Sequence, residues 1–419
     1  MNNIKKDLEL GSVSFITKLA GFEHTEYIKP NATKEKINGD DVPMYIGMNI
    51  KNGRLTKEIS WFLPKKISLQ LHRSALTKKC LVLPYVGSVG DVAVFDSEER
   101  HHLASNVAKI ELTDDAPFSP EYLYYFLKSP FGQRKLLFYI QGGVQKNITI
   151  DAIRKTIIPI QDNANKIVQI LSDLDNKIEL NNRINAELEA MAKTIYDYWF
   201  VQFDFPDKNG MPYKTSGGKM VWNDELKREI PEGWGTGTLL DIANYENGLP
   251  CQKYRPTGSD FLRVIKIREM NEGFSSNTEH VKTDIPEKAI IENGDVLFSW
   301  SASLDVKLWT GGKGALNQHI FKVTSNSHPK SFYFHQLLNY LQHFKMMAEN
   351  RKTTMGHITQ EHLKQSRIVI PLKQLTLDLE KIIAPLYSKK VINEIENQKL
   401  AELRDWLLPM LMNGQVKVN

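Results

Sequence analysis

The stretch from Asp162 to Phe200 constrains the fold most, because it predicts a single long helix with a narrow apolar face. It contains no glycine and no proline. At a rise of 1.5 Å per residue the helix would be about 58 Å long. An apolar seam this narrow is typical of pairing with one other helix rather than with a globular core. Two rows with seven-residue spacing form the seam: Ile167, Leu174, Asn181, Leu188 and Ile195, with Leu171, Ile178, Asn185, Ala192 and Trp199.

A second helix of the same kind is predicted at Lys373–Met412, because the pattern recurs 212 residues later. The match begins before the helices, where Ile158-Pro159-Ile160 corresponds to Ile370-Pro371-Leu372. The chain is therefore predicted to contain two tandem repeats. Each repeat consists of a globular stretch, a short Ile-Pro segment that leads out of it, and a long helix. Within the helices, Ile167, Leu171, Leu174, Asn181 and Asn185 correspond to Leu379, Ile383, Leu386, Asn393 and Asn397.

Asparagines interrupt both apolar seams near the helix midpoints. If the two helices pack antiparallel, these asparagines can form one central polar layer. A buried asparagine in a coiled coil fixes the register of the helices at some expense of stability. We therefore predict an antiparallel pair whose register is set by Asn181, Asn185, Asn393 and Asn397. The alternative is that they are solvated polar residues on two unrelated helices.

The globular stretches predict an α+β fold class with small curved β-sheets, because short β-branched runs alternate with turn residues and a few helices. Five segments follow: residues 1–161 as the first globular domain, 162–203 as the first long helix, 204–234 as a connector, 235–372 as the second globular domain and 373–419 as the second long helix. We expect a short helix near Asn223–Arg228 in the connector. Pro385 should kink the second long helix or mark its start.

Motifs of catalysis and metal binding are missing from the sequence. It contains no Walker A loop, no GxSxG and no HExxH. Cys80 and Cys251 are isolated, which argues against a zinc cluster or a disulfide framework. His101-His102 lies in a charged stretch and is predicted to be a solvated loop. Trp199 and Trp406 have helical surroundings and are predicted to be core residues. We therefore expect no catalytic residue and no metal in this chain.

Hydropathy indicates a cytoplasmic protein, and the distribution of charge is compatible with a polyanionic partner without requiring one. No apolar run reaches the length needed to cross a membrane, and the first ten residues lack the apolar core of a signal peptide. The whole chain carries +5, while the two long helices together carry −3. The remaining +8 therefore lies on the other parts of the chain. A basic excess there fits nucleic acid as the partner, although a solvated basic surface would give the same pattern.

The connector carries the most specific resemblance. Its sequence from Phe203 to Trp234, FDFPDKNGMPYKTSGGKMVWNDELKREIPEGW, resembles the central region of specificity subunits of type I restriction–modification enzymes. The C-terminal NQKLAELRDWLLPMLMNGQVKV resembles the second helical region of that family. The motif Pro231-Glu232-Gly233-Trp234 precedes the second domain, as it does in the family. The corresponding stretch before the first domain, Leu8–Gly11, lacks this motif, so the N-terminal boundary of the first domain is not defined by the resemblance.

The resemblance implies a DNA sequence-specificity subunit that is itself non-catalytic. Each globular domain would read one half of a bipartite site on double-stranded DNA. The helix pair would set the distance between the half-sites and dock two modification subunits. Those methyltransferase subunits would carry S-adenosylmethionine, and two restriction subunits would add ATP- and Mg-dependent cleavage. No cofactor is expected in this chain. The alternatives are a stand-alone DNA-binding regulator with an intramolecular coiled coil, or a nuclease or methyltransferase with unrecognised motifs.

Two loops at equivalent positions of the repeat are candidates for DNA contacts. QGGVQKN at 141–147 and NRKTTMGH at 350–357 combine basic side chains with amides and hydroxyls, which serve phosphates and base edges. Ordinary polar loops are the alternative. The candidates in these loops are Gln145, Lys146, Asn147, Arg351, Lys352, Thr353 and Thr354. Those at the ends of predicted strands are Gly87, Ser88, Ser299, Trp300 and Ser301.

Overall fold

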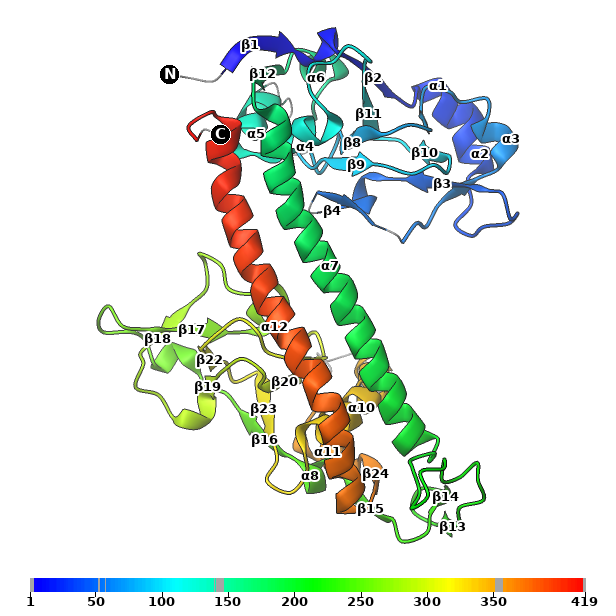
Figure 1. Ribbon diagram of the computed structural model, residues 1–419, viewed down its shortest axis with the longest axis vertical. Helices are drawn as coiled ribbons and strands as arrows, with labels where there is room; N and C mark the ends of the chain where they lie inside the picture. Colours follow the sequence, from blue (N-terminus) through cyan, green and yellow to red (C-terminus); the bar gives the residue numbers. More distant parts are fainter. Residues whose placement is uncertain are drawn as a thin grey trace. The chain divides into compact units, whose positions relative to one another are not determined.

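The computed structural model (Figure 1) describes residues 4–51, 53–56, 58–138, 140, 147–350 and 357–416. It contains two compact units. Unit 1 comprises Met1–Lys177 with Leu400–Asn419, and unit 2 comprises Ile178–Lys399. The boundaries fall inside the two long helices, α7 (Ala164–Tyr196) and α12 (Lys373–Met412). Each unit therefore contains a globular part and one segment of each long helix.

Unit 1 begins with an entry strand that pairs antiparallel with an exit strand, β1 with β12. The chain between β1 and β12 forms two four-stranded sheets, with strand orders β2-β11-β8-β9 and β6-β3-β10-β7. The strands are β1 (Ile4–Glu9), β2 (Ser14–Lys18), β3 (Val42–Tyr45), β4 (Ile50–Lys51), β5 (Arg54–Leu55), β6 (Phe62–Leu63), β7 (Ala75–Leu76), β8 (Cys80–Pro84), β9 (Ala93–Phe95), β10 (His101–Leu103), β11 (Val107–Leu112) and β12 (Ile157–Gln161). The helices are α1 (Gly21–Glu23), α2 (Lys29–Asn31), α3 (Lys65–Ser68), α4 (Pro120–Lys128), α5 (Pro130–Leu137) and α6 (Ile150–Arg154).

Unit 2 repeats this topology. Its entry strand β15 pairs antiparallel with its exit strand β24, and its sheets have the orders β16-β23-β20-β21 and β18-β17-β22-β19. The strands are β13 (Met220–Asn223), β14 (Arg228–Pro231), β15 (Gly235–Thr238), β16 (Asn244–Asn247), β17 (Leu262–Ile265), β18 (His280–Val281), β19 (Ile290–Ile291), β20 (Val296–Ser299), β21 (Asp305–Leu308), β22 (Gly314–Leu316), β23 (Ile320–Thr324) and β24 (Arg367–Ile370). The helices are α8 (Leu239–Ile242), α9 (Ile267–Glu272), α10 (Lys330–Asn350) and α11 (Gln360–Gln365). The α+β class and the tandem repeat are thus confirmed.

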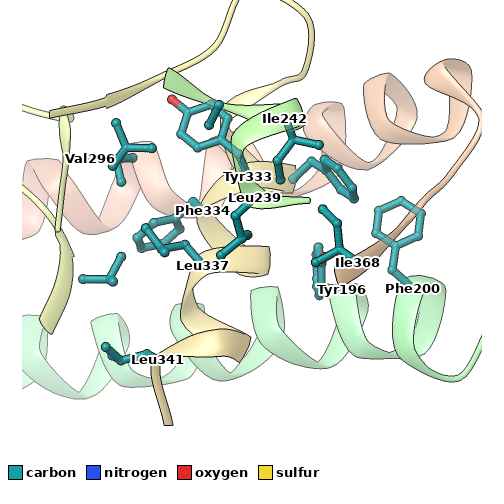
Figure 2. Packing of buried hydrophobic residues seen from close by; sticks show 14 of the residues in the cluster. Tyr196, Phe200, Leu239, Ile242, Val296, Tyr333, Phe334, Leu337, Leu341 and Ile368 are labelled. Atoms are coloured by element: carbon teal, nitrogen blue, oxygen red, sulfur yellow. The ribbon is translucent and has the colours of Figure 1, made fainter. Parts of the chain in front are cut away.

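The long helices contribute to the hydrophobic core of each unit. In unit 2, Tyr196 at the end of α7 and Phe200 in the π-helical turn that follows it pack among Leu239, Leu337 and Ile368 (Figure 2). In unit 1, the last turns of α12 are buried against the N-terminal sheets and helices through Leu408, Leu411 and Met412. Burial of apolar surface is the main stabilising contribution to folding. Neither globular part therefore completes its core without both helices.

Asparagine pairs link the two long helices within unit 2. Asn181 Nδ2 donates to Asn397 Oδ1 at 2.9 Å, and Asn393 Nδ2 donates to Asn185 Oδ1 at 2.9 Å. From the first pair to the second, the residue number increases by four in α7 and decreases by four in α12, so the two helices run antiparallel. Asn181 and Asn393 are each only 1% exposed. Their side-chain amides are buried and paired across the helix interface, which is the arrangement that disfavours other registers.

The contact between globular part and long helix differs chemically between the units. In unit 1, the Tyr125 hydroxyl donates to Asp175 at 2.8 Å, and Arg404 forms an ion pair with Asp175 at 2.7 Å. In unit 2, the position 212 residues after Asp175 is Tyr387, whose hydroxyl lies 2.9 Å from His335 Nε2. The same junction is therefore ionic in unit 1 and neutral in unit 2.

The predicted connector helix near Asn223–Arg228 is wrong. Met220–Asn223 and Arg228–Pro231 pair antiparallel as a β-hairpin. Asn223 begins the turn, since its Oδ1 accepts from the Leu226 N–H at 2.9 Å. Lys227 closes the turn with a φ of 51°, a left-handed conformation that does not occur inside a helix.

Two further sequence interpretations need correction. His101 and His102 do not form a solvated loop: they lie in strand β10 and are 8% and 0% exposed. His102 Nε2 is 3.1 Å from the Leu71 carbonyl, and burial lowers the pKa of His102. Trp199 is buried as predicted, but Trp406 is 63% exposed. Of the two alternatives for Pro385, the structure excludes the start of the helix, because Pro385 lies inside α12.

Candidate nucleic-acid interface

In unit 1, the chain segments around the end of strand β8 meet at Tyr85. The Tyr85 N–H donates to the Asn106 carbonyl at 3.0 Å, and the Ile148 N–H donates to the Tyr85 carbonyl at 3.0 Å. Lys18, the last residue of β2, places its Nζ 4.4 Å from the centroid of the Tyr85 ring. An ammonium group at this distance from an aromatic face is attracted to it. Tyr85 and Lys18 therefore place an aromatic ring and a positive charge together next to Ile148.

In unit 2, Trp300 occupies the equivalent position after strand β20. The Trp300 N–H donates to the His319 carbonyl at 3.4 Å, and the Ile358 N–H donates to the Trp300 carbonyl at 2.9 Å. Asn247, the last residue of β16, accepts from Trp300 Nε1 at 2.9 Å. The rings of His319 and His357 each lie 5.5 Å from the Trp300 ring. The backbone arrangement of unit 1 is thus repeated with another set of side chains.

Some of the predicted contact residues lie at these two places. Gly87 and Ser88 follow Tyr85, and Asn147 bridges to Val86. Gly87 has a φ of 86°, and a Cβ placed there would meet nothing within 4 Å, so this turn is open on its outer side. The loop residues Gln145, Lys146, Arg351, Lys352, Thr353 and Thr354 lie outside the described residues.

Ser299 and Ser301 are positioned for structure rather than for contact. They are 0% and 5% exposed. The Ser299 hydroxyl donates to the Ser303 carbonyl at 2.6 Å and accepts from the Asp305 N–H at 2.9 Å. These bonds hold the turn that carries Trp300. Of the three consecutive candidates in unit 2, Trp300 is therefore the one we retain for contact with a ligand.

Sequence reasoning missed Tyr85, Lys18, Asn247 and His319. Their equivalence is hidden because the spacing between corresponding residues changes along the repeat, from 210 at Ile148 and Ile358 to 215 at Tyr85 and Trp300. The backbone hydrogen bonds show that Tyr85 and Trp300 occupy equivalent positions, which a comparison at one constant residue offset does not show. A search that allowed the offset to vary by a few residues would have paired these two aromatic positions.

Among the described residues, no group of three or more His, Cys, Asp or Glu side chains is placed to hold a metal ion. Burial raises the pKa of the Cys80 thiol to about 12, which makes it a poor nucleophile. In the part of the chain that the structure describes, no helix has the length and apolarity to span a membrane. The surfaces at Tyr85 and Trp300 offer aromatic rings, hydrogen-bonding groups and, at Lys18, a positive charge, which are groups that bind a ligand without reacting with it.

Comparison with known proteins gives consistent matches over almost the whole chain. A family model described as the type I restriction modification DNA specificity domain matches residues 17–190 and again residues 231–405. The specificity subunit of the type I restriction enzyme MjaIX from Methanocaldococcus jannaschii is 23% identical over 438 residues, covering 100% of this chain and 95% of that protein. The HindI specificity subunit from Haemophilus influenzae is 24% identical over 356 residues, covering 71% of this chain and 77% of that protein.

A solved structure shares the fold. The S subunit of a type I restriction–modification system from M. genitalium has a TM-score of 0.58 and 15% sequence identity. The likeness covers 98% of this chain and 97% of that one. Each stretch matched by the family model combines one globular part with most of one long helix, which is the repeating plan seen in the structure.

Proposed function

The chain belongs to the type I restriction–modification DNA specificity family, and on that premise we propose that it is the subunit that selects the DNA sequence on which such an enzyme acts. The observation that carries this proposal is the repeated fold: two units with the same sheet topology, each matched by the specificity domain. The role is recognition rather than catalysis. In this proposal S-adenosylmethionine, ATP and Mg bind to partner subunits.

Each unit reads one half of a bipartite site on double-stranded DNA. The support is that each unit has its own aromatic residue after the corresponding strand, Tyr85 in unit 1 and Trp300 in unit 2. Their neighbours differ: Lys18 lies beside Tyr85, whereas Asn247 binds Trp300. Because amides, basic groups and hydroxyls pair differently with base edges, different side chains on one scaffold read different sequences. The two half-sites should therefore differ in sequence.

The two long helices set the distance between the half-sites and dock the two modification subunits. The buried asparagine pairs support the first role, because they hold one register of α7 against α12. Exposed apolar side chains on α12 support the second: Ile392 is 58%, Leu403 43% and Trp406 63% exposed. Large apolar residues left on a helix surface commonly mark contacts with other proteins. Two restriction subunits complete the proposed complex.

Replacing one globular part should change only one half of the recognised site. Residues 239–366, between β15 and β24, would be exchanged for the corresponding segment of a relative, so that the strand pair and both helices remain. We expect the methylated motif of the intact system to change in one half-site and keep its other half-site. The reciprocal exchange of residues 10–156, between β1 and β12, is the matched control and should change the other half. If one exchange altered both half-sites, independent reading would be disproved.

Changing Trp300 to alanine should weaken DNA binding about tenfold, since truncating a tryptophan that contacts a partner commonly costs more than about 1 kcal/mol. The measurement is fluorescence anisotropy with a duplex that carries the motif methylated by the intact system. Trp222→Ala is the matched control, because Trp222 is a 60% exposed tryptophan of unit 2 on the connector hairpin. Equal affinities of Trp300→Ala and the unmodified protein would remove this surface from the interface.

A further inference from the structure

A surface of unit 1 has an equivalent in unit 2 that another part of the chain contacts. In unit 1 the surface lies between helix α5 and the start of the exit strand β12, and we call it the α5 surface. Its described residues are Phe131, Arg134, Lys135, Phe138, Lys155 and Ile157. In unit 2 a corresponding surface lies between α10 and the start of β24. Its residues there include Tyr340, His343, Phe344, Met347, Gln365 and Arg367.

The helical sides of the two surfaces match in spacing. Four residues along α5 and its C-cap line the α5 surface, at positions i, i+3, i+4 and i+7 from Phe131. Four residues of α10 line the surface of unit 2 at the same intervals from Tyr340. Side chains at these intervals lie on one face of a helix. The two helices therefore present equivalent faces.

The exit strands match in position. The Thr156 carbonyl accepts from the N–H of the residue after β1 at 2.9 Å, and the Ser366 carbonyl accepts from the N–H of the residue after β15 at 3.3 Å. Thr156 and Ser366 are therefore equivalent in the repeat. The next residue of each unit lines its surface, Ile157 in unit 1 and Arg367 in unit 2.

In unit 2 the connector faces this surface. Leu226 and Arg228 of the connector line the same space as the residues of α10 and β24. Glu225, in the turn of the connector hairpin, forms an ion pair with Arg367 at 3.4 Å. Met347, the last of the four residues on the α10 face, is partly buried. The surface of unit 2 is thus already contacted by a protein segment that supplies apolar side chains and a carboxylate.

The α5 surface is more exposed and more basic. Phe138, the last residue on its helical face, is 79% exposed. Arg134 and Lys155 are exposed, and Lys135 Nζ lies 5.2 Å from the Phe131 ring centroid. Among the described residues no carboxylate lines the surface, and none of its three basic side chains forms an ion pair. Aromatic rings beside uncompensated positive charge are complementary to a protein segment with apolar and acidic side chains.

We propose that the α5 surface docks an apolar and acidic segment of a modification subunit. This inference rests on the proposed function, which supplies that subunit. The segment takes the place that the connector takes in unit 2: an apolar side chain packs on Phe138, and carboxylates pair with Arg134 and Lys155. Protein is favoured over DNA because the equivalent surface of unit 2 contacts protein. The surface also adjoins the proposed docking region, since β12 leads into α7 at Ala164.

Photo-crosslinking of the intact complex tests the position of the contact. The full chain carries p-benzoylphenylalanine in place of Phe138 and is purified together with its modification subunits. We expect a cross-link to a modification subunit, and mass spectrometry should locate it in a segment that contains Asp or Glu. A cross-link to DNA or to a second copy of this chain, or the absence of any cross-link, would contradict the proposal.

Charge reversal tests the chemistry of the contact. Arg134→Glu with Lys155→Glu should weaken binding of the modification subunit to the full chain by about tenfold or more, because like charges then face each other. Both side chains are exposed, so the fold should not change. Lys65→Glu with Lys66→Glu, at two exposed lysines of α3, is the matched control and should bind as the unmodified chain does. Lysines in place of the carboxylates of the cross-linked segment should restore binding to the first double variant.

DNA binding by the chain without its partners separates the two possible occupants. Both double variants reverse the same amount of charge and should lower DNA affinity equally. A larger loss in Arg134→Glu with Lys155→Glu would assign the surface to DNA and overturn the proposal. If the unmodified chain bound no modification subunit, the proposed function itself would fail. If it bound one, and Arg134→Glu with Lys155→Glu bound equally well, only the docking inference would fail.

Discussion

Lengthening both long helices by four residues should lengthen the spacer of the recognised DNA site by about one or two base pairs. The insertions belong between Ala186 and Glu187 in α7 and between Val391 and Ile392 in α12. These points face each other, since Asn185 pairs with Asn393. Four residues add about 6 Å to a helix, and DNA rises about 3.4 Å per base pair. The half-site sequences should not change, because neither globular part is altered. Methylation mapping of the intact system measures the spacer.

Insertions of two residues at the same points are the matched control. Two residues rotate the following part of each helix by about 200°, which turns the apolar seam away from its partner. Four residues keep the seam nearly in phase. We therefore expect the two-residue variant to lose assembly with the modification subunits, as measured by co-purification. A functional four-residue variant with an unchanged spacer would mean that something other than these helices sets the distance.

Acidification from pH 6.5 to pH 5 should destabilise unit 2 by about 2 kcal/mol through His335 alone. Burial lowers the pKa of this imidazole to about 3, and the positive charge of Lys193 acts in the same direction. The neutral ring lies 2.9 Å from the Tyr387 hydroxyl and stacks on Tyr196 at 4.5 Å. In the unfolded chain a histidine has a pKa of about 6.5. Below that pH the unfolded state binds a proton that the folded state excludes.

The sign of this effect follows from the lowered pKa. The stabilising contribution of neutral His335 is complete above about pH 6.5 and is lost as the pH falls toward 3, at about 1.4 kcal/mol per pH unit. Denaturant unfolding at pH 6.5 and pH 5 gives the measurement, in a range where most carboxylates stay ionised. His335→Asn should lose about 2 kcal/mol less over this range than the unmodified chain. His280→Asn, at an exposed histidine of the same unit, should behave as the unmodified chain does.

Most of the fold follows from local patterns that the sequence makes visible. The long helices, the repeat and strands such as Val107–Leu112 and Arg367–Ile370 each show a hydrophobic period or a β-branched run. The errors arise where tertiary contacts override the local pattern. The stretch containing His101 and His102 is charged, yet the strand pairs with β3 and β7 and is buried. Trp406 lies on an apolar helix, but its own face of that helix is exposed.

The candidate interface was harder to predict for a different reason. The surroundings of each strand end come from segments that are distant in sequence. The backbone of Tyr85 forms hydrogen bonds with Asn106 and Ile148, and the ammonium group of Lys18 contacts its ring. No local pattern connects these residues. Trp300 was identified because it follows a clear strand, whereas Asn247, its hydrogen-bond partner 53 residues earlier, has no signal of its own.

The shared helices have a consequence for how the protein is made. Unit 1 needs the last turns of α12: Leu408, Leu411 and Met412 belong to its core, and Gln161 Nε2 donates to the Leu411 carbonyl at 2.9 Å. A ribosome synthesises these turns after all the residues of unit 2. During translation the first unit therefore emerges with part of its apolar surface uncovered, and unit 2 has all its residues available first. Unit 1 is thus completed only after unit 2 has been synthesised, so a product truncated before Leu408 should be defective in unit 1 although it contains all of Met1–Lys177.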